Sequence, residues 1–228
     1  ACNLGEMAAD TFHNDQHKDL KADFIMANPP FNQKGWRADN ELVDDSRWMG
    51  YDTPPTSNAN YGWILNIVSK LSANGTAGFL LANGALSGDG TELAIRKQLI
   101  QNHVVEAIVI LPRNMFYSTD ISVTLWILNN NKKARTVEQN GKIVRYRKRE
   151  NEVLFIDLRQ WGEPFEKKYI QFSTEQIQQI AENFHNWQRE GYEDTYRDVP
   201  EYCYSATTEE IEQKGWSLVP CLLYTSDA

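Results

Sequence analysis

The chain has 228 residues, enough for one large domain or for one domain with an appendage, and its hydrophobic content of 41% suffices for a packed core. No apolar stretch is long enough to cross a membrane, and no signal peptide is recognisable. The three scattered cysteines argue against a disulfide framework or a zinc site, and they fit a reducing cytoplasm. The net charge of −8 makes the chain a poor general polyanion binder, so any contact with DNA must use a local basic patch or a partner subunit.

The first predicted element is a buried parallel strand over residues 23–27, which ends in the turn Asn28-Pro29-Pro30-Phe31. Each proline fixes its own φ and lacks an N–H, and the first also pushes Asn28 out of the helical region, so the turn is stiff. Open α/β sheets bind ligands at the carboxyl ends of their strands. There the Asn28 side-chain oxygen and the Pro29 carbonyl can converge as two acceptors beside the flat ring of Phe31. This arrangement suits a planar ring with an exocyclic amino group, such as a flipped-out adenine.

The middle of the chain alternates between strands and helices. Residues 32–59 are polar and predict a long loop that could cover the target base. The elements expected after it are a helix over 60–73 capped by Gly75, a strand over 76–82, a helix over 92–102, and strands over 104–111, 122–128 and 153–158. This order predicts a parallel sheet covered by helices, in which the strands on either side of Pro112 form an antiparallel edge hairpin.

A basic segment over residues 132–149 stands out in an acidic chain. Asn140-Gly141 predicts a hairpin turn within it. A phosphate-contacting arm and an ordinary solvated excursion both explain such a charge run, and both stay open. The residues expected to contact DNA in the first case are Lys142, Arg145, Arg147, Lys148 and Arg149.

The C-terminal part carries two capping boxes, in which a hydroxyl and a Glu or Gln side chain satisfy the first amides of a helix. Ser173-Thr174-Glu175-Gln176 opens a long helix that we expect to run to about Arg189. Thr207-Thr208-Glu209-Glu210 opens a short helix that Gly215 ends.

The longer run from Asp10 to Asn32, with Asn28-Pro29-Pro30-Phe31 at its end, resembles the methylation subunit of type I restriction-modification systems, which are N6-adenine DNA methyltransferases. The resemblance extends to about Pro220. Residues 221–228 depart from the family pattern and are expected to be a non-native or truncated tail. The family's glycine-rich cofactor loop, expected upstream of Asn28, has no match, which predicts an N-terminal truncation.

The resemblance implies a partial Rossmann-like, S-adenosylmethionine-dependent methyltransferase fold: a mixed sheet with an antiparallel edge strand and a C-terminal helical extension. Residues 1–160 are then the C-terminal part of the catalytic domain, and residues 161–220 are the helical extension. The run from Gly84 to Gly90 is the alternative candidate for a cofactor loop, although the resemblance favours an ordinary strand-to-helix connection.

The resemblance also implies direct methyl transfer from S-adenosylmethionine to the amino group of adenine. Asn28 and Pro29 would bind that amine, Pro30 would shape the turn, and Phe31 would stack on the base. Asp10 would accept a hydrogen bond from the cofactor's adenine amine, with Thr11 and Phe12 against the same ring. No metal is required.

The expected partners are double-stranded DNA, a specificity subunit that reads its sequence, and a restriction subunit. Because the upstream cofactor loop has no match, we expect residues 1–228 alone to show no measurable S-adenosylmethionine binding and to be inactive; a micromolar dissociation constant would contradict this. Two other functions stay open. A methyltransferase for a protein glutamine or for RNA shares the Asn-Pro-Pro-aromatic motif, and a non-catalytic DNA- or partner-binding module is compatible with the missing loop.

Overall fold

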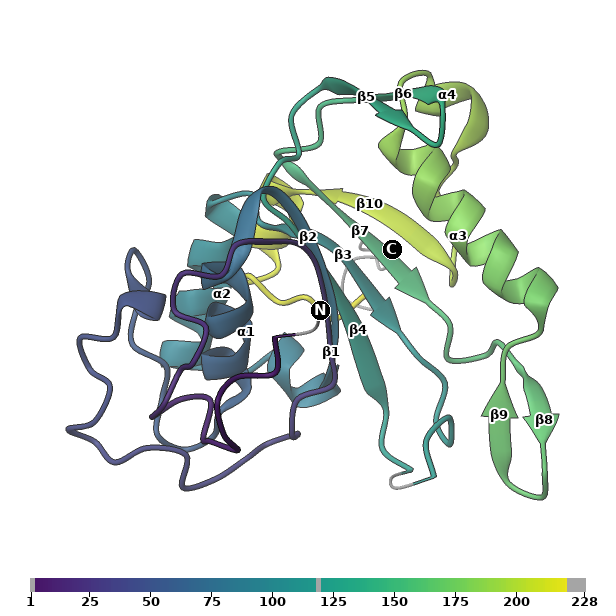
Figure 1. The fold of residues 1–228 in the computed structure, drawn as a ribbon. Coiled ribbons are helices and arrows are strands. Elements are labelled where there is room, and N and C mark those ends of the chain that lie inside the picture. The colour runs from purple at the N-terminus through teal and green to yellow at the C-terminus, as the bar shows by residue number, and fades with distance from the viewer. Residues whose placement is uncertain (1–2, 118–119, 221–228) are drawn as a thin grey trace.

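A computed structural model describes residues 3–117 and 120–220, in which a six-stranded mixed sheet separates two helical layers (Figure 1). The strand order is β1-β2-β4-β3-β7-β10, with parallel pairs β1–β2 and β3–β7. The sheet strands are β1 (Ala22–Ala27), β2 (Leu71–Ala82), β3 (Val105–Ile110), β4 (Val123–Asn129), β7 (Glu152–Asp157) and β10 (Cys203–Thr207). The expected α/β class with a mixed sheet and an antiparallel edge strand is confirmed.

Alternation along the strands divides the core into two clusters. On one face, Phe79, Ile108 and Phe155 pack beneath the helices α1 (Asn60–Ser69), α2 (Thr91–Gln101) and α5 (Thr208–Gln213). On the other face, Val109 and Ile156 pack beneath α3 (Thr174–Gln188). The remaining short elements are η1 (Ser46–Trp48), η2 (Asn83–Leu86), α4 (Tyr192–Thr195) and the two hairpins, β5 (Arg135–Gln139) with β6 (Lys142–Tyr146) and β8 (Glu163–Phe165) with β9 (Tyr169–Gln171).

The position of β4 differs from the expectation. β3 and β4 are antiparallel, as predicted, but β4 also pairs with β2 from Thr76↔Asn129 to Ala82↔Val123, so it lies in the middle of the sheet. The antiparallel edge strand is β10, which pairs with β7. Sequence separation alone favoured a terminal hairpin, whereas β4, with five of its seven residues buried, gains more burial at a central position.

The predicted helix end at Gly75 is wrong. Helix α1 ends at Ser69 with Lys70 as its C-cap, and β2 already begins at Leu71. Gly75 lies inside that strand, where a Cβ atom would meet the Ala22 carbonyl oxygen at 2.6 Å. The glycine therefore permits close approach of the β2 backbone to β1 rather than capping a helix.

Both capping boxes are present as predicted. Ser173 and Gln176 exchange side-chain and backbone hydrogen bonds at the start of α3, and Thr207 and Glu210 do the same at α5. The segment 161–220 also contains β8, β9 and β10, so its elements are not all helical. The division of the chain near residue 160 stays a prediction, and residues 221–228 lie outside the described residues. Among the helices of the described ranges, none is both long and apolar enough to span a bilayer.

The β5–β6 hairpin has the predicted Asn140-Gly141 turn, in which both residues have positive φ. A buried ionic network joins its base to the sheet. Arg149 Nε donates to Glu106 Oε1 at 2.8 Å with both side chains fully buried, and Lys132 Nζ donates to the carbonyls of Val105 and Glu152. The basic residues at the ends of the hairpin therefore hold it in place.

Burial in this network lowers the pKa of Lys132 to about 8, because desolvation outweighs the attraction of Glu106. The lysine of the unfolded chain titrates near its ordinary value of about 10.4. Between these two values the unfolded chain binds more protons than the folded chain, so the contribution of Lys132 to the free energy of unfolding rises with pH. The free energy of unfolding of the wild type and of Lys132→Met is measured in urea at pH 7 and pH 9.5. Relative to the variant, the wild type should gain about 2 kcal/mol at the higher pH. Parallel pH profiles would contradict the assignment.

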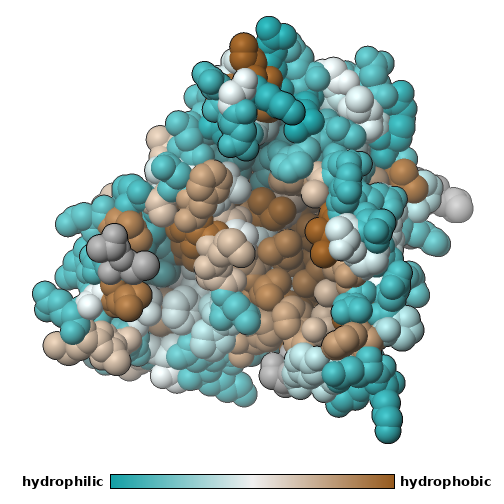
Figure 2. Space-filling view, turned by 45° about the vertical axis from the view of Figure 1, so that its right-hand side comes forward, coloured by the Kyte–Doolittle hydropathy of each residue, from teal (hydrophilic) through white to brown (hydrophobic). Residues whose placement is uncertain are grey.

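One face of the sheet is open beside α3. The prediction that the strand over residues 23–27 is buried is wrong, because Phe24 and Met26 of β1 are 81% and 93% exposed. β1 also has no partner on its outer edge among the described strands. Figure 2 shows the apolar surface in the hollow between the N-terminal segments and α3. An apolar groove of 270 Å³ lies under α3, lined by residues that include Leu125, Ile127 and Ile177.

Candidate active site

The turn Asn28-Pro29-Pro30-Phe31 follows the last residue of β1, at the carboxyl edge of the parallel strands. Pro29 is buried and Phe31 is half-buried, whereas Asn28 is exposed. No hydrogen bond within residues 3–117 and 120–220 uses the Asn28 side chain. Its amide is therefore available to a ligand at the edge of the sheet where α/β proteins bind them.

A pair of asparagines, Asn32 and Asn60, joins the turn to the start of α1. Asn32 has a φ of 51°; its amide donates to Asn60 Oδ1 at 3.0 Å, and Asn60 Nδ2 donates back to Asn32 Oδ1 at 2.9 Å. Asn60 is buried at the first residue of α1 and its own N–H donates to Asn58 Oδ1. Sequence reasoning missed this clamp. The signal available was an Asn-x-Asn at a helix start, a position where asparagine commonly satisfies free amides.

A cavity of 390 Å³ lies beside the turn. Asn28, Pro29 and Pro30 line it from the turn, and Trp63 and Ile67 line it from α1. Trp63 is held by a 3.3 Å hydrogen bond from its Nε1 to Gln33 Oε1. The lining combines one free amide with mainly apolar walls, which suits a flat heteroaromatic ring.

Asp10, Thr11 and Phe12 reach this region from the N-terminal segment. Partial burial raises the pKa of Asp10, but hydrogen bonds from the amides of Phe12 and His13 outweigh it and hold the pKa below its usual value. The carboxylate is half-exposed, so an ionised acceptor faces solvent. Thr11 is exposed, whereas the Phe12 ring is 3% exposed and packs at 4.4 Å from the Trp63 ring. The structure thus joins this segment to the Asn28 cavity through Trp63, and it leaves Phe12 no free ring face.

Arg47 ties the N-terminal segment to the loop that follows the turn. Its guanidinium pairs with Asp45 at 2.7 Å and donates to the carbonyls of Thr11 and Phe12. Trp36 and Trp48 of the same loop are buried against this site. Residues 32–59 are thus anchored by aromatic side chains, and their role as a cover for the target base stays a prediction.

The basic hairpin lies at the other end of the sheet. β4 runs antiparallel to β3, so its last residue, Asn129, lies level with the start of the parallel strands, and β5 and β6 project from that edge (Figure 1). Arg149 is paired with Glu106, and Arg147 pairs with Glu152 at 2.8 Å. These two arginines are corrections to the expected phosphate contacts, because their charges are used inside the protein. Lys142, Arg145 and Lys148 remain exposed.

The Gly84–Gly90 alternative for the cofactor loop also has a defined place in the structure. The Gly84–Gly90 run is a connection whose Leu86 carbonyl accepts from Leu218 and whose Gly88 carbonyl accepts from Arg96. His13 contacts Asp10 and Glu41. Within the described part of the chain, no group of three or more His, Cys, Asp or Glu side chains is placed to hold a metal ion.

Comparison with known proteins gives a consistent result. The family model described as N-6 DNA Methylase matches residues 2–226. The type I restriction enzyme HindI methylase subunit of Haemophilus influenzae is 41% identical over 96% of this chain and 45% of its own length. The MjaIX methylase subunit of Methanocaldococcus jannaschii is 33% identical over 92% of this chain and 36% of its own length.

Among solved structures, the type I restriction-modification methyltransferase subunit from Streptococcus thermophilus superposes with a TM-score of 0.75 at 25% identity, over 92% of this chain and 40% of that one. The chain thus spans less than half the length of these relatives. The resemblance inferred from the residues around Asn28 is confirmed, and the chain belongs to the N-6 DNA methylase family.

Proposed function

We propose that this chain forms the catalytic-turn portion of an adenine-N6 DNA methyltransferase subunit in a type I restriction-modification system. It would act in the cytoplasm on double-stranded DNA, together with a specificity subunit and a restriction subunit. The observation that carries the proposal is the free Asn28 amide, held on a stiff Pro-Pro turn beside an apolar cavity of 390 Å³. Asn32, four residues away, has the same side chain but uses it in the clamp with Asn60.

For methyl transfer, the turn must activate a weak nucleophile. The lone pair of an adenine amine is delocalised into the ring. Hydrogen bonds from its two N–H groups to Asn28 Oδ1 and the Pro29 carbonyl favour the form in which that pair is localised on nitrogen. These bonds strengthen as positive charge develops on nitrogen, so they lower the free energy of the transition state more than that of the bound substrate. Phe31 would stack on the extruded base, and Pro30 keeps the turn rigid.

S-adenosylmethionine, when bound, supplies a methyl group on a sulfonium centre. The ionised, half-exposed carboxylate of Asp10 fits the amine of its adenine as an acceptor, with the exposed Thr11 beside it. The buried ring of Phe12 does not fit a stacking role, so we assign it to packing against Trp63.

The test uses the full-length protein that carries this sequence, co-expressed with its specificity subunit, and maps N6-methyladenine across the host genome by single-molecule sequencing. We expect one defined sequence motif to be methylated. Labelling of cellular protein and RNA with a radioactive methyl donor serves as the comparison, since related methyltransferases with an Asn-Pro-Pro-aromatic turn act on glutamine or RNA. Label in protein or RNA without a methylated DNA motif would overturn the proposal.

A further inference from the structure

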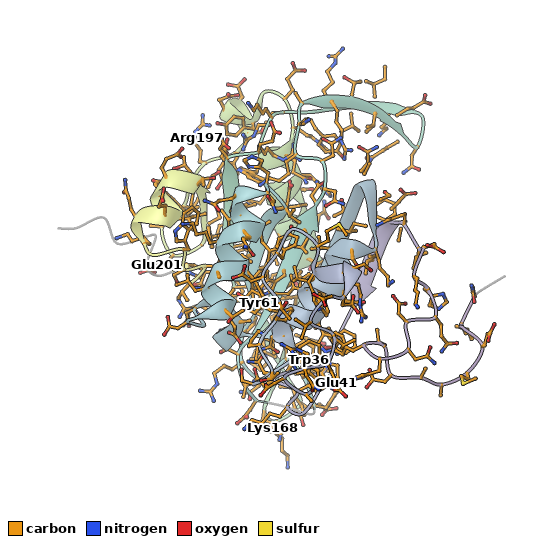
Figure 3. The ribbon with its side chains drawn as sticks, turned by 90° about the vertical axis from the view of Figure 1, so that its left-hand side faces the viewer. Trp36, Glu41, Tyr61, Lys168, Arg197 and Glu201 are labelled. Carbon is orange, nitrogen blue, oxygen red and sulfur yellow. The ribbon has the colours of Figure 1, made fainter. Side chains whose placement is uncertain are left out.

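The sheet edge that carries Asn28 also carries three other segments. β1, β2, β3 and β7 run in the same direction, so the connection after β3, the connection after β7 and the β8–β9 hairpin all lie at this edge (Figure 1). β3 is three strands from β1 and β7 is four, which corresponds to about 14–19 Å at a spacing of about 4.8 Å. In Figure 3, Lys168 of the β8–β9 hairpin lies at the same end of the molecule as Trp36 and Glu41 of the loop that follows the catalytic turn.

These segments border an open cavity of 600 Å³ with a mixed polar and apolar lining. Its lining includes Arg113 and Asn114 from the connection after β3, and Arg159 and Trp161 from the connection after β7. The Arg159 guanidinium binds both carboxylate oxygens of Asp157, at 3.0 Å and 2.6 Å, which fixes its direction. Arg113 Nε donates to the Asp120 carbonyl. Two guanidinium groups thus stand at one pocket on the catalytic edge.

The hairpin is held against this pocket by several contacts. The Ile170 amide donates to the Asn114 carbonyl at 3.1 Å. The Tyr117 and Tyr169 rings have their centroids 4.4 Å apart, and the Lys168 ammonium lies 5.1 Å from the centroid of the Tyr169 ring. Gly162, with a φ of 98°, lets the hairpin base close, because a Cβ atom there would meet Ile170 Cγ2 at 2.4 Å. Tyr117, 69% exposed, and the exposed Lys168 are therefore presented from an ordered support.

The local charge differs from that of the chain. Residues 112–122 and 159–171 contain four basic side chains (Arg113, Arg159, Lys167 and Lys168) against three acidic ones (Asp120, Glu163 and Glu166), whereas the whole chain has a net charge of −8. An exposed aromatic ring beside arginine and lysine is a typical nucleic-acid contact. The β5–β6 hairpin, in contrast, projects from the opposite edge.

We propose that Arg113, Tyr117 and Lys168 form a second DNA contact that binds the phosphodiester backbone on the catalytic side of the sheet. Arg113 offers a planar fork to a phosphate, Lys168 offers a point charge, and Arg159 acts as a positioning residue. At about 3.4 Å per base pair, a separation of about 14–19 Å places these phosphates four to six base pairs from the flipped adenine. This inference rests on the proposed function, because it takes DNA as the ligand.

The test compares two double variants of the full-length protein that carries this sequence, each purified together with its specificity subunit. Arg113→Gln/Lys168→Gln removes two charges at the catalytic edge. Arg189→Gln/Arg197→Gln removes two exposed charges at the opposite end of the molecule, where Arg189 bridges Tyr146 of β6 and Arg197 is labelled in Figure 3. The dissociation constant for a duplex containing the methylated motif is measured between 50 and 200 mM salt. We expect the first variant to bind at least tenfold more weakly and to lose about 1.8 from the slope of log K against log salt, and the second to change by less than twofold.

Hydroxyl-radical footprints locate the contact. In the first variant, protection should disappear four to six base pairs from the target adenine and persist around it. The inference would be overturned if both double variants weakened DNA binding equally. It would also be overturned if the first variant left the dissociation constant and the footprint unchanged. All four substituted side chains are exposed, and matching thermal unfolding curves confirm that each variant is folded.

Kinetics separate this inference from the proposed function. The Arg113→Gln/Lys168→Gln variant should raise the KM for DNA at least fivefold and leave kcat within twofold of the wild type. If methylation itself is absent but the duplex is bound and the first variant alone weakens binding, the proposed function fails and the DNA contact stands. If methylation is present and the KM of the first variant is unchanged, the contact fails and the proposed function stands.

Discussion

Replacing Asn28 by alanine is expected to lower kcat for methyl transfer by at least about 10²–10³-fold, the usual effect of removing one preorganised hydrogen-bonding group from a transition state. The substitution removes the side-chain acceptor and leaves the Pro29 carbonyl and the rigid turn in place. The dissociation constant for DNA should change little, because the bond strengthens mainly as charge develops on the amine. Single-turnover transfer of a radioactive methyl group to a defined duplex measures the effect.

Two further variants sharpen this test. Asn28→Asp keeps an acceptor oxygen in the same place and should retain more activity than Asn28→Ala. Asn40→Ala removes an exposed asparagine from the loop after the turn and should leave kcat unchanged. An Asn28→Ala enzyme with kcat close to that of Asn40→Ala would remove Asn28 from the catalytic role.

Replacing Arg149 by methionine should cause the largest loss of stability, about 3–5 kcal/mol, because Glu106 would keep its charge in a fully buried site without its partner. Arg149 also donates to the Arg147 carbonyl, so the base of the β5–β6 hairpin would loosen as well. Urea unfolding at pH 7 gives the free energy. The matched control is Arg145→Met on the same hairpin, 66% exposed and paired with Glu190 at 3.9 Å, which should cost less than about 0.5 kcal/mol.

The double variant Glu106→Leu/Arg149→Met tests whether the loss comes from an unpaired charge. Glu106 Oε2 and Arg149 Nη2 have no hydrogen-bond partner within the described residues, so the network is not fully satisfied even in the wild type. Replacing both partners with apolar side chains should therefore recover most of the stability lost in the single variant. A double variant as unstable as Arg149→Met alone would instead attribute the loss to packing.

Local patterns predicted the elements whose causes are local. The strand before Asn28, the helix over 92–102, both capping boxes and the Asn-Gly hairpin turn depend on neighbouring residues, and each is present. The central position of β4 and the existence of β10 depend on pairing between distant strands. The sequence of β10, Cys203–Thr207, has no clear apolar alternation, and its register is set by β7. Gly75 was misread because a glycine near a helix end is more often a cap than a close backbone contact.

The candidate site divides in the same way. Asn28-Pro29-Pro30-Phe31 could be identified because its chemistry and its rigidity both lie in four consecutive residues. The Asn32–Asn60 clamp and the Arg47 bridge join segments 28 or more residues apart, which no local pattern reports. Burial explains the arginine error: composition marked Arg147 and Arg149 as basic, but only the packed structure shows that Glu152 and Glu106 neutralise them.

The outer edge of β1, with which no other described strand pairs, affects how this polypeptide behaves at high concentration. Unpaired N–H and C=O groups on an edge strand can form hydrogen bonds to a strand of another molecule. Contact with the large exposed side chains of Phe24 and Met26 would favour such pairing. The residues of β1 offer one charge, Asp23, and no proline to oppose it. Self-association should therefore rise steeply with protein concentration and fall when Met26 is replaced by lysine. Aggregation of the folded polypeptide, rather than its free energy of unfolding, would then set the highest usable concentration.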